Sequence, residues 1–166
     1  MPESPIIIAT RGSALALAQA NFIFDQCRAA FPRLAFEIQI FKTTGDKLQT
    51  ASLAQAGQSL PKGLFTKELE VALVRQKADI AVHSLKDLPT ELPAGLTLGA
   101  TTKREDVRDV LIYKTNAGHT GPIPQLAEGA RVATSSTRRQ AQLAAARPNL
   151  QLEEIRGNVP TRLEKL

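Results

Sequence analysis

The sequence has 166 residues, of which 43% are hydrophobic, so it can bury a core and is not expected to be disordered. Its formal net charge of +5 at pH 7 favours an anionic partner, and charge alone leaves nucleic acid, an acidic membrane surface and a small polycarboxylate or phosphate open. With no tryptophan and one tyrosine, the chain lacks the stacking aromatics common in nucleic-acid binding, so we expect a small anionic ligand and no nucleic acid.

The first residues and the single cysteine narrow the class of protein. No basic stretch precedes Pro5, and the apolar run 6–9 is too short for a signal peptide or a membrane span, so we expect a cytoplasmic protein without membrane contact. Cys27 is the single cysteine, which excludes an intrachain disulfide and a metal site made of several cysteines, and no metal site is predicted. Its helical surroundings favour a buried structural thiol over a reactive one.

The first part of the chain alternates between strand and helix patterns. The predicted elements are a strand over 5–9, a helix over 14–30, a strand over 36–41, a helix over 66–75 and strands over 79–83 and 96–100. Ser13 can cap the first helix, which stops before Pro32. A long loop, typical of mobile lids, precedes the second helix. This alternation predicts an α/β fold.

A charged run at 103–106 interrupts the pattern, and we place a domain boundary there, between residues 1–102 and 103–166. The elements predicted beyond it are a strand over 131–133, a helix over 136–146, a strand over 151–155 and a helix from about 159. The last helix is predicted to be still running at Leu166, so we expect the chain to end inside a domain.

Three strand-to-loop junctions share one design, at 9–13, 133–139 and 155–159. Each places hydroxyls, glycine or backbone N–H groups beside arginine at the start of a helix, where N–H groups, helix dipole and guanidinium all favour an anion. In open α/β sheets ligands gather at the carboxyl ends of the strands, where all three junctions are expected. Together they favour a multiply charged ligand. The alternative for any one junction is an ordinary helix cap beside an exposed arginine.

Arg138 and Arg139 fall in the first turn of the helix predicted over 136–146. Cations there oppose the helix macrodipole by roughly 0.3–1 kcal/mol each, and a bound carboxylate would reverse that penalty. Solvated surface arginines are the alternative.

A second charged group follows the strand predicted over 79–83. Lys86 and Asp87 are expected to project into one crevice, where Asp87 could accept hydrogen bonds from N–H donors or stabilise a cationic intermediate, or form an ordinary salt bridge. His83 has no metal-ligand partner one helical turn away, which favours a hydrogen-bonded structural histidine. Lys62, in the long loop, could bring another cation to a ligand or be a solvated lysine.

Seven strings, taken in order, carry a resemblance to a known family. They are ATRGSALA at 9–16, TGD at 44–46, KGLFTKELE at 62–70, ADIAVHSLKDLP at 78–89, RED at 104–106, TSSTRRQ at 134–140 and RGNVPTRL at 156–163. Their order and spacing resemble the porphobilinogen deaminase (hydroxymethylbilane synthase) family over essentially the whole chain.

The resemblance implies a transferase of tetrapyrrole (haem and porphyrin) biosynthesis, which joins four porphobilinogen units into hydroxymethylbilane and releases ammonia. It implies three domains, the first two being two-lobed, periplasmic-binding-protein-like α/β domains with mixed sheets and the active site between them. The family tethers a dipyrromethane cofactor to a cysteine of the third domain. The full-length protein is expected to be a monomer.

The resemblance also assigns residue roles. Asp87 corresponds to the catalytic aspartate that contacts pyrrole N–H groups and assists deamination and coupling. The residues that correspond to binding sites for acetate and propionate groups are Arg11, Ser13, Lys62, Lys86, Thr134, Ser136, Arg138, Arg139, Arg156 and Arg162. Gln19 and Ser84 match further cleft positions, and Ser135 and Gly157 complete the junctions that hold this set. The charges agree, because every added pyrrole brings two carboxylates.

The sequence departs from the family in three places. The segment 55–61 looks longer than the family's glycine-rich connection, which bears on the lid and on Lys62, and Thr137 stands where leucine is common. On the family pattern, domain 1 lacks a later return segment, the second domain is incomplete and the third is absent. We therefore expect no dipyrromethane bound to this chain and no activity from it alone, since Cys27 lies in a different context. The alternative function is a non-catalytic two-lobed anion-binding module.

Overall fold

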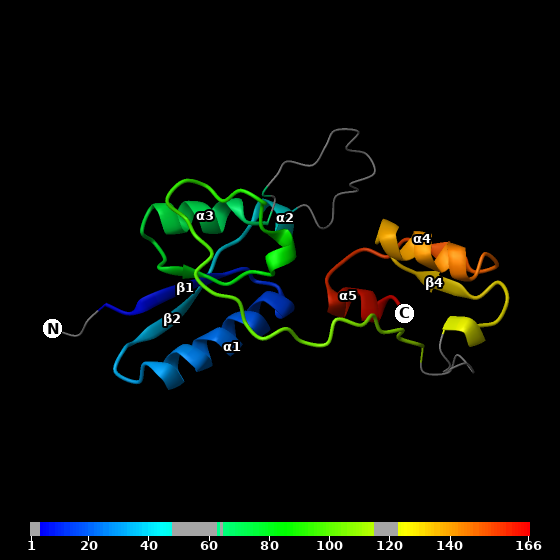
Figure 1. The fold of residues 1–166 in the computed structure, drawn as a ribbon, viewed down its shortest axis with the longest axis horizontal. Coiled ribbons are helices and arrows are strands. Elements are labelled where there is room, and N and C mark those ends of the chain that lie inside the picture. Colours follow the sequence, from blue (N-terminus) through cyan, green and yellow to red (C-terminus); the bar gives the residue numbers. More distant parts are fainter. Residues whose placement is uncertain (1–3, 48–62, 64, 115–122) are drawn as a thin grey trace. The chain divides into compact units, whose positions relative to one another are not determined.

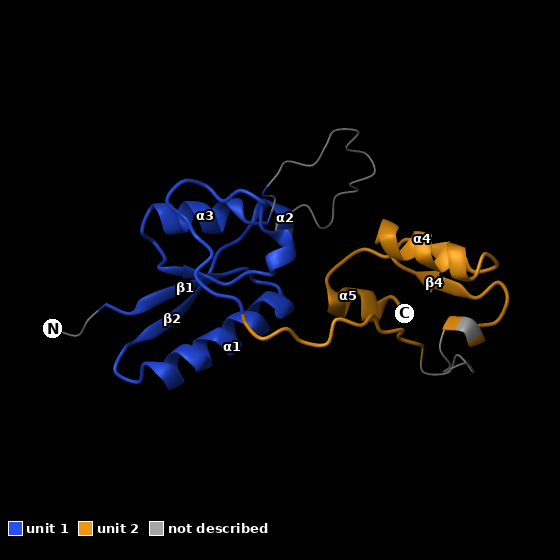
Figure 2. Cartoon of the chain, viewed as in Figure 1, with its two compact units in different colours: residues 1–101 blue, residues 102–166 orange. Residues whose placement is uncertain are grey.

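The computed structural model describes residues 4–47, 63, 65–114 and 123–166, and the chain falls into two compact units, unit 1 (1–101) and unit 2 (102–166) (Figures 1 and 2). Each unit combines strands and helices, which confirms the predicted α/β class. Within the described residues every strand pairing is parallel, and the mixed sheets that the resemblance implies are not seen among them. No helix of this part of the chain is long and apolar enough to cross a membrane.

Unit 1 is built on a parallel sheet with the strand order β2-β1-β3. Its elements are β1 (Ile6–Thr10), α1 (Ala14–Ala30), β2 (Phe36–Ile40), α2 (Thr44–Lys47), α3 (Lys67–Val74), β3 (Ile80–Ala81) and the 3₁₀ helix η3 (Leu85–Asp87). The central strand β1 pairs on both edges, and its residues Ile8, Ala9 and Thr10 are fully buried. An apolar, β-branched run is what a strand covered on both faces requires.

Helices α1 and α3 cover opposite faces of this sheet (Figure 1). On the α3 face Ala9 packs with Leu69 and Ala72, all at most 2% exposed. Because side chains alternate along a strand, Ile8 points to the other face, which α1 covers with its buried Ala20. The strand ends are therefore held between two packed helices, and the loops that follow them are anchored at their bases.

Unit 2 is built on a two-stranded parallel sheet of β4 and β5. Its elements are the 3₁₀ helix η4 (Ile123–Gln125), β4 (Arg131–Ala133), α4 (Thr137–Ala146), β5 (Gln151–Glu153) and α5 (Val159–Glu164). Leu126, Val132 and Leu150 form its core, each 8% exposed. Leu111 and Tyr113, from the segment before η4, pack against that core, so this irregular segment is tied to the unit.

The prediction of a strand over 96–100 is wrong. Gly95 has a positive φ of 85°, Leu96 N–H donates to the Pro93 carbonyl at 3.1 Å in a turn, and the residues from 97 to 100 are exposed without strand structure. The alternation of Leu96 and Leu98 is typical of a strand, but a strand also needs a neighbour for its backbone groups. The sheet of the described residues provides none there.

Other differences concern element ends and one side chain. The helix predicted to run through Leu166 ends at Glu164. Lys165 N–H still donates to the Thr161 carbonyl at 3.3 Å, but Leu166 N–H donates to the Leu163 carbonyl at 3.2 Å, in a tighter turn. β3 is shorter than predicted, although Asp79 N–H and Val82 N–H extend its bonding to β1. The short helix α2 lies inside the predicted long loop, and Cys27 is partly exposed rather than buried.

Candidate functional site

The first predicted junction lies at the carboxyl end of β1, as expected. Ser13 caps α1, its Oγ accepting a hydrogen bond from Ala16 N–H at 3.3 Å, while the buried Thr10 hydroxyl donates to the Ala16 carbonyl at 3.2 Å. Ser13 is thus bound to the helix start and orients the loop that carries Arg11.

The loop after β3 lies beside this junction, because β1 and β3 are parallel neighbours with Ala9 opposite Ala81. Ser84 Oγ donates to Gln19 Oε1 on α1 at 3.1 Å. The structure therefore joins two of the predicted cleft residues, and it leaves the Gln19 amide donors without a partner in the described ranges.

Lys86 and Asp87 follow in η3, whose turn is closed by Asp87 N–H donating to the Ser84 carbonyl at 3.0 Å. Lys86 is exposed and Asp87 is partly buried. Among the residues that the structure describes, no side chain forms a salt bridge or hydrogen bond with the Asp87 carboxylate. Lys62 lies outside the described residues.

Sequence reasoning missed Phe65 at this edge. The Arg11 guanidinium carbon lies over the Phe65 ring, 4.4 Å from its centroid, a cation–π contact that holds the arginine at the strand end. His83 Nε2 lies 3.1 Å from the Phe65 carbonyl and its Nδ1 lies 3.2 Å from the Ser84 carbonyl, which confirms the structural histidine. The available signal is that Phe65 lies within a string that carries the family resemblance.

The second and third junctions come together at the carboxyl ends of β4 and β5. Thr134 N–H donates to the Glu153 carbonyl at 2.8 Å, and Ser135 Oγ donates to the Ile155 carbonyl at 2.5 Å. These bonds place the loop that enters α4 against the loop that enters α5. The two junctions form one polar edge of unit 2.

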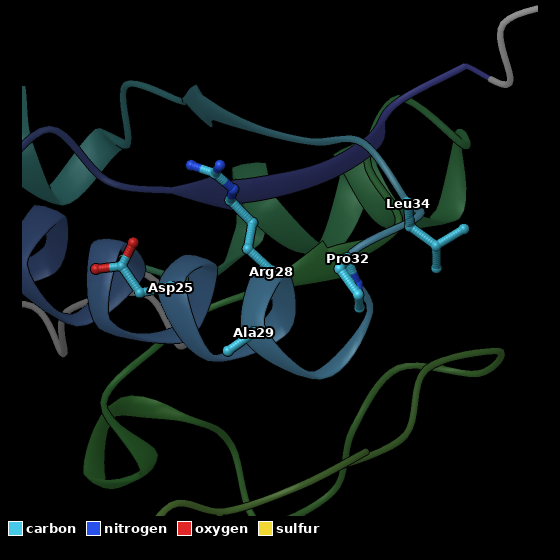
Figure 3. A pocket seen from close by; sticks show the side chains of 5 residues that line it. All are labelled: Asp25, Arg28, Ala29, Pro32 and Leu34. Atoms are coloured by element: carbon cyan, nitrogen blue, oxygen red, sulfur yellow. The ribbon is translucent and has the colours of Figure 1, made fainter.

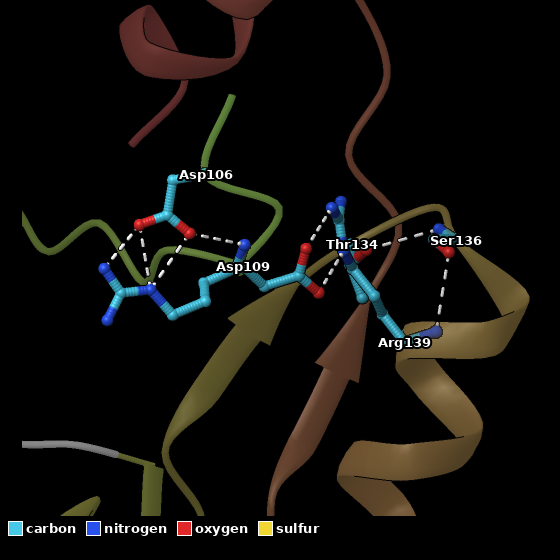
Figure 4. Close-up of polar contacts among 6 residues, drawn as sticks. Asp106, Asp109, Thr134, Ser136 and Arg139 are labelled. Atoms are coloured by element: carbon cyan, nitrogen blue, oxygen red, sulfur yellow. Dashed lines mark hydrogen bonds and ion pairs between the residues drawn. The ribbon is translucent and has the colours of Figure 1, made fainter. Parts of the chain in front are cut away.

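Three hydroxyls of this edge hold its backbone. Thr134 is 7% exposed, and its Oγ1 accepts from Ser136 N–H at 3.2 Å (Figure 4). Ser136 caps α4 by accepting from Arg139 N–H at 3.4 Å. With Ser135 bonded as above, the hydroxyls shape the loop, and the charged groups remain to meet a ligand.

The two adjacent arginines of α4 differ in their partners. Arg139 donates from Nε to Asp109 Oδ2 at 2.8 Å and from Nη2 to Asp109 Oδ1 at 2.6 Å (Figure 4). The hydrogen bonds to Arg139 lower the pKa of Asp109, and Asp109 raises the pKa of Arg139. Arg138 is exposed and has no such partner in the described part of the chain. Asp109 was not among the predicted site residues.

Arg162 and Arg156 also use Nε within unit 2. Arg162 Nε donates to the Gly157 carbonyl at 2.7 Å, and Arg156 Nε lies 3.4 Å from Glu154 Oε2. Gly157 has a φ of +121°, and a Cβ there would lie 2.8 Å from Thr161 Cγ2. The tight turn before α5 therefore requires glycine.

The charges of this edge suit anions. This edge carries four arginines (Arg138, Arg139, Arg156 and Arg162), and two carboxylates, those of Asp109 and Glu154, pair with Arg139 and Arg156.

Within the described ranges no cluster of histidine, cysteine or acidic side chains could hold a metal ion. A pocket at the last turns of α1, lined by Asp25, Arg28, Ala29, Pro32 and Leu34, contains none of the predicted site residues (Figure 3).

Comparison with known proteins identifies the family. Residues 6–166 match the family model described as porphobilinogen deaminase, dipyromethane cofactor binding domain. The chain belongs to the porphobilinogen deaminase family. Porphobilinogen deaminase of Desulforudis audaxviator is 50% identical over 161 residues, covering 97% of this chain and 50% of that protein. The same enzyme of Paracoccus denitrificans is 51% identical over 167 residues, covering 99% and 51%. The chain therefore spans about half the length of the curated deaminases that it matches.

Proposed function

We propose that this chain forms the substrate-facing part of a porphobilinogen deaminase, which joins four porphobilinogen molecules into hydroxymethylbilane and releases ammonia. Membership of the family supports the reaction. The Asp87 carboxylate carries the assignment to these residues, because it is partly buried at the carboxyl edge of the unit 1 sheet and no described residue pairs with it. A carboxylate that no described residue engages can accept hydrogen bonds from a ligand.

Asp87 is the proposed catalytic residue. Its carboxylate can accept hydrogen bonds from pyrrole N–H groups and stabilise the positive charge that develops as the amino group leaves as ammonia. A negative charge fixed in place before the reaction needs no reorganisation when the cation forms. The bond between Ser84 and Gln19, together with the turn of η3, supports this fixed position.

The cationic and polar residues of the predicted site are proposed to bind acetate and propionate groups. In unit 1 these are Arg11, Ser13, Gln19, Lys62, Ser84 and Lys86. In unit 2 they are Thr134, Ser135, Ser136, Arg138, Arg139, Arg156, Gly157 and Arg162. The arginines carry most of the binding, since a guanidinium can hold a carboxylate through two parallel hydrogen bonds. The hydroxyls and the glycine act mainly through the loop backbone that they hold.

The residues present fit a dipyrromethane cofactor. Its two pyrroles carry several carboxylates, which match the arginine-rich edge of unit 2, and N–H groups, which match Asp87. When bound, this group supplies the chain end to which the first porphobilinogen is joined. We propose that it is attached to a cysteine other than Cys27, because the helical rise places Cys27 roughly 20 Å along α1 from Ser13.

The two units are proposed to act as two lobes, with domains at 1–102 and 103–166 and the active site between them. The division of the chain at Thr101 and Thr102 supports this boundary, as does the presence of described, predicted site residues at the carboxyl edge of each unit. We further propose a cytoplasmic monomer whose partner is porphobilinogen, supported by the charge and by the few aromatic residues.

The test is Asp87→Asn in the full-length protein, with porphobilinogen consumption as the measurement. We expect turnover to fall by about a hundredfold or more with the fold retained, because the amide keeps the shape and removes the charge. Asp25→Asn is the matched control, the same substitution on an exposed residue of α1. Normal turnover by Asp87→Asn would overturn the catalytic role. If the wild-type protein never consumes porphobilinogen, and both it and the variant bind porphobilinogen, the alternative of a non-catalytic anion-binding module is favoured.

A further inference from the structure

We infer that Asp109 is a positioning residue, which orients the Arg139 guanidinium so that the edge facing away from Asp109 binds a carboxylate of the substrate or cofactor. This inference rests on the proposed function. It adds a residue outside the predicted site, and it predicts that an acidic side chain assists the binding of an anion. Four observations on unit 2 support it.

The first observation is the geometry of the pair. Two nearly parallel hydrogen bonds join Arg139 Nε and Nη2 to the two oxygens of Asp109, at 2.8 and 2.6 Å. A guanidinium has five N–H donors, and this pairing uses two of them. The remaining three lie on Nη1 and on the outer side of Nη2, where they form a second edge that can hold another carboxylate through two hydrogen bonds.

The second observation is that both residues are held by their backbone. Arg139 N–H donates to the Ser136 cap, which places the arginine in the first turn of α4 (Figure 4). Asp109 lies two residues before Leu111, which packs against the core of unit 2 together with Tyr113. The carboxylate is therefore fixed to the unit, and it can fix the guanidinium in turn.

The third observation is the contrast with Arg138. This neighbour is exposed and has no partner within the described residues, so its long side chain must lose rotamer freedom when it binds an anion. Arg139 has given up much of that freedom already. A preoriented group binds its ligand with a smaller entropy cost.

The fourth observation is exposure. The side chains of Arg139 and Asp109 are 52% and 63% exposed, so solvent screens the pair and it contributes little to folding stability. A bidentate pair that does little for the fold is better explained by the orientation that it gives to Arg139. The effects of Asp109 on ligand binding and on stability can therefore be separated by experiment.

The experiment is Asp109→Asn in the full-length holoenzyme, with kcat and KM for porphobilinogen and the melting temperature measured together. We expect KM to rise about threefold to tenfold, with kcat and melting temperature nearly unchanged, because the guanidinium is kept and its orientation is lost. In the Arg139→Lys background the same substitution should have no further effect, since a lysine ammonium cannot form the paired bonds. Asp109→Glu, which keeps the carboxylate, should recover part of the loss.

Glu153→Gln is the matched control. Glu153 forms an equivalent pair with Arg131, at 2.6 and 2.8 Å, and neither residue belongs to the proposed site, so KM should stay at the wild-type value. An unchanged KM for Asp109→Asn, in an enzyme whose wild type consumes porphobilinogen, overturns the inference and leaves the proposed function intact. A lower KM also overturns it, because Asp109 would then compete with the ligand. A wild type without turnover overturns both.

Discussion

The polar edges of the two units are built in the same way but differ in their charged groups, because unit 1 combines Arg11 and Lys86 with the Asp87 carboxylate, whereas unit 2 is rich in arginine. In unit 1 hydroxyl, amide and imidazole groups bond to backbone or to one another, and the Asp87 carboxylate pairs with no side chain of the described residues. In unit 2 the hydroxyls again hold the backbone, but three arginines donate from Nε to groups of their own unit (Arg139, Arg156 and Arg162). Their Nη edges remain for other partners.

This difference suggests how the work is divided under the proposed function. Unit 1 would supply the fixed negative charge for the chemistry beside cations of its own, and unit 2 would supply most of the oriented arginines that hold a growing polycarboxylate. A mobile arginine can bind any carboxylate at some entropy cost, whereas one held at Nε accepts a carboxylate from one direction. A division of this kind predicts that substitutions in unit 2 change binding, while Asp87→Asn changes the rate.

The largest effect in unit 2 is expected for Arg138→Leu. Loss of a charge-assisted hydrogen bond to a carboxylate costs about 1.5–3 kcal/mol, so we expect the KM for porphobilinogen to rise about tenfold to a hundredfold, or chain elongation to stop early. Steady-state kinetics and the mass of enzyme-bound intermediates measure these outcomes. Arg139→Leu should have a similar effect.

Arg131→Leu is the control for that experiment, because Arg131 is an exposed arginine of the same unit that pairs with Glu153. Its KM should be that of the wild type. If Arg138→Leu lowers kcat and leaves KM unchanged, the proposed division between the two units is wrong, and unit 2 takes part in the rate-limiting step.

A smaller effect, on stability, is expected for Gly157→Ala. The residue has a φ of +121° and a Cβ would lie within 2.9 Å of two Thr161 atoms, so we expect a loss of about 1–3 kcal/mol in unfolding free energy. The Gly157 carbonyl accepts the Arg162 bond, so ligand binding should weaken as well. Denaturant unfolding measures the loss. Gly99→Ala, where a Cβ meets nothing within 4 Å, should be nearly neutral.

Much of the fold was predictable because its signals are local. Ser13 before an apolar-periodic stretch predicts the start of α1, and the isoleucines of β1 predict a buried strand, and both are found. The strand predicted over 96–100 failed because the existence of a strand depends on a neighbour that periodicity cannot reveal. The end of α5 depends on which carbonyl accepts the hydrogen bonds of the last N–H groups, and the residue types at the helix end do not determine this pairing.

The positions of the three junctions were predictable from the sequence, whereas the contacts between their side chains were not. Glycine, hydroxyls and arginine at strand ends identified the junctions, and the structure places each at the carboxyl end of its strand. The contacts of Arg139 with Asp109 and of Arg11 with Phe65 join residues far apart in the sequence. Neither partner carries a local signal of the contact. Such pairs depend on tertiary packing, and only a structure reveals them.

The smallest expected effect is the response of the ion pairs of unit 2 to acid. In unit 2 hydrogen bonds from arginines lower the pKa values of Asp106, Asp109 and Glu153. A pKa lowered by folding contributes stability that is present above the unfolded-state value, about 4, and is lost as the pH falls through the folded-state value. The stability advantage of wild type over Asp109→Asn should therefore vanish at low pH, and it should be small throughout because these carboxylates are exposed. Melting curves from pH 6 downwards, with a carboxyl ¹³C titration of Asp109, measure both quantities. An advantage that does not change with pH would come from packing, and the ion pair of Asp109 with Arg139 would then have no part in stability.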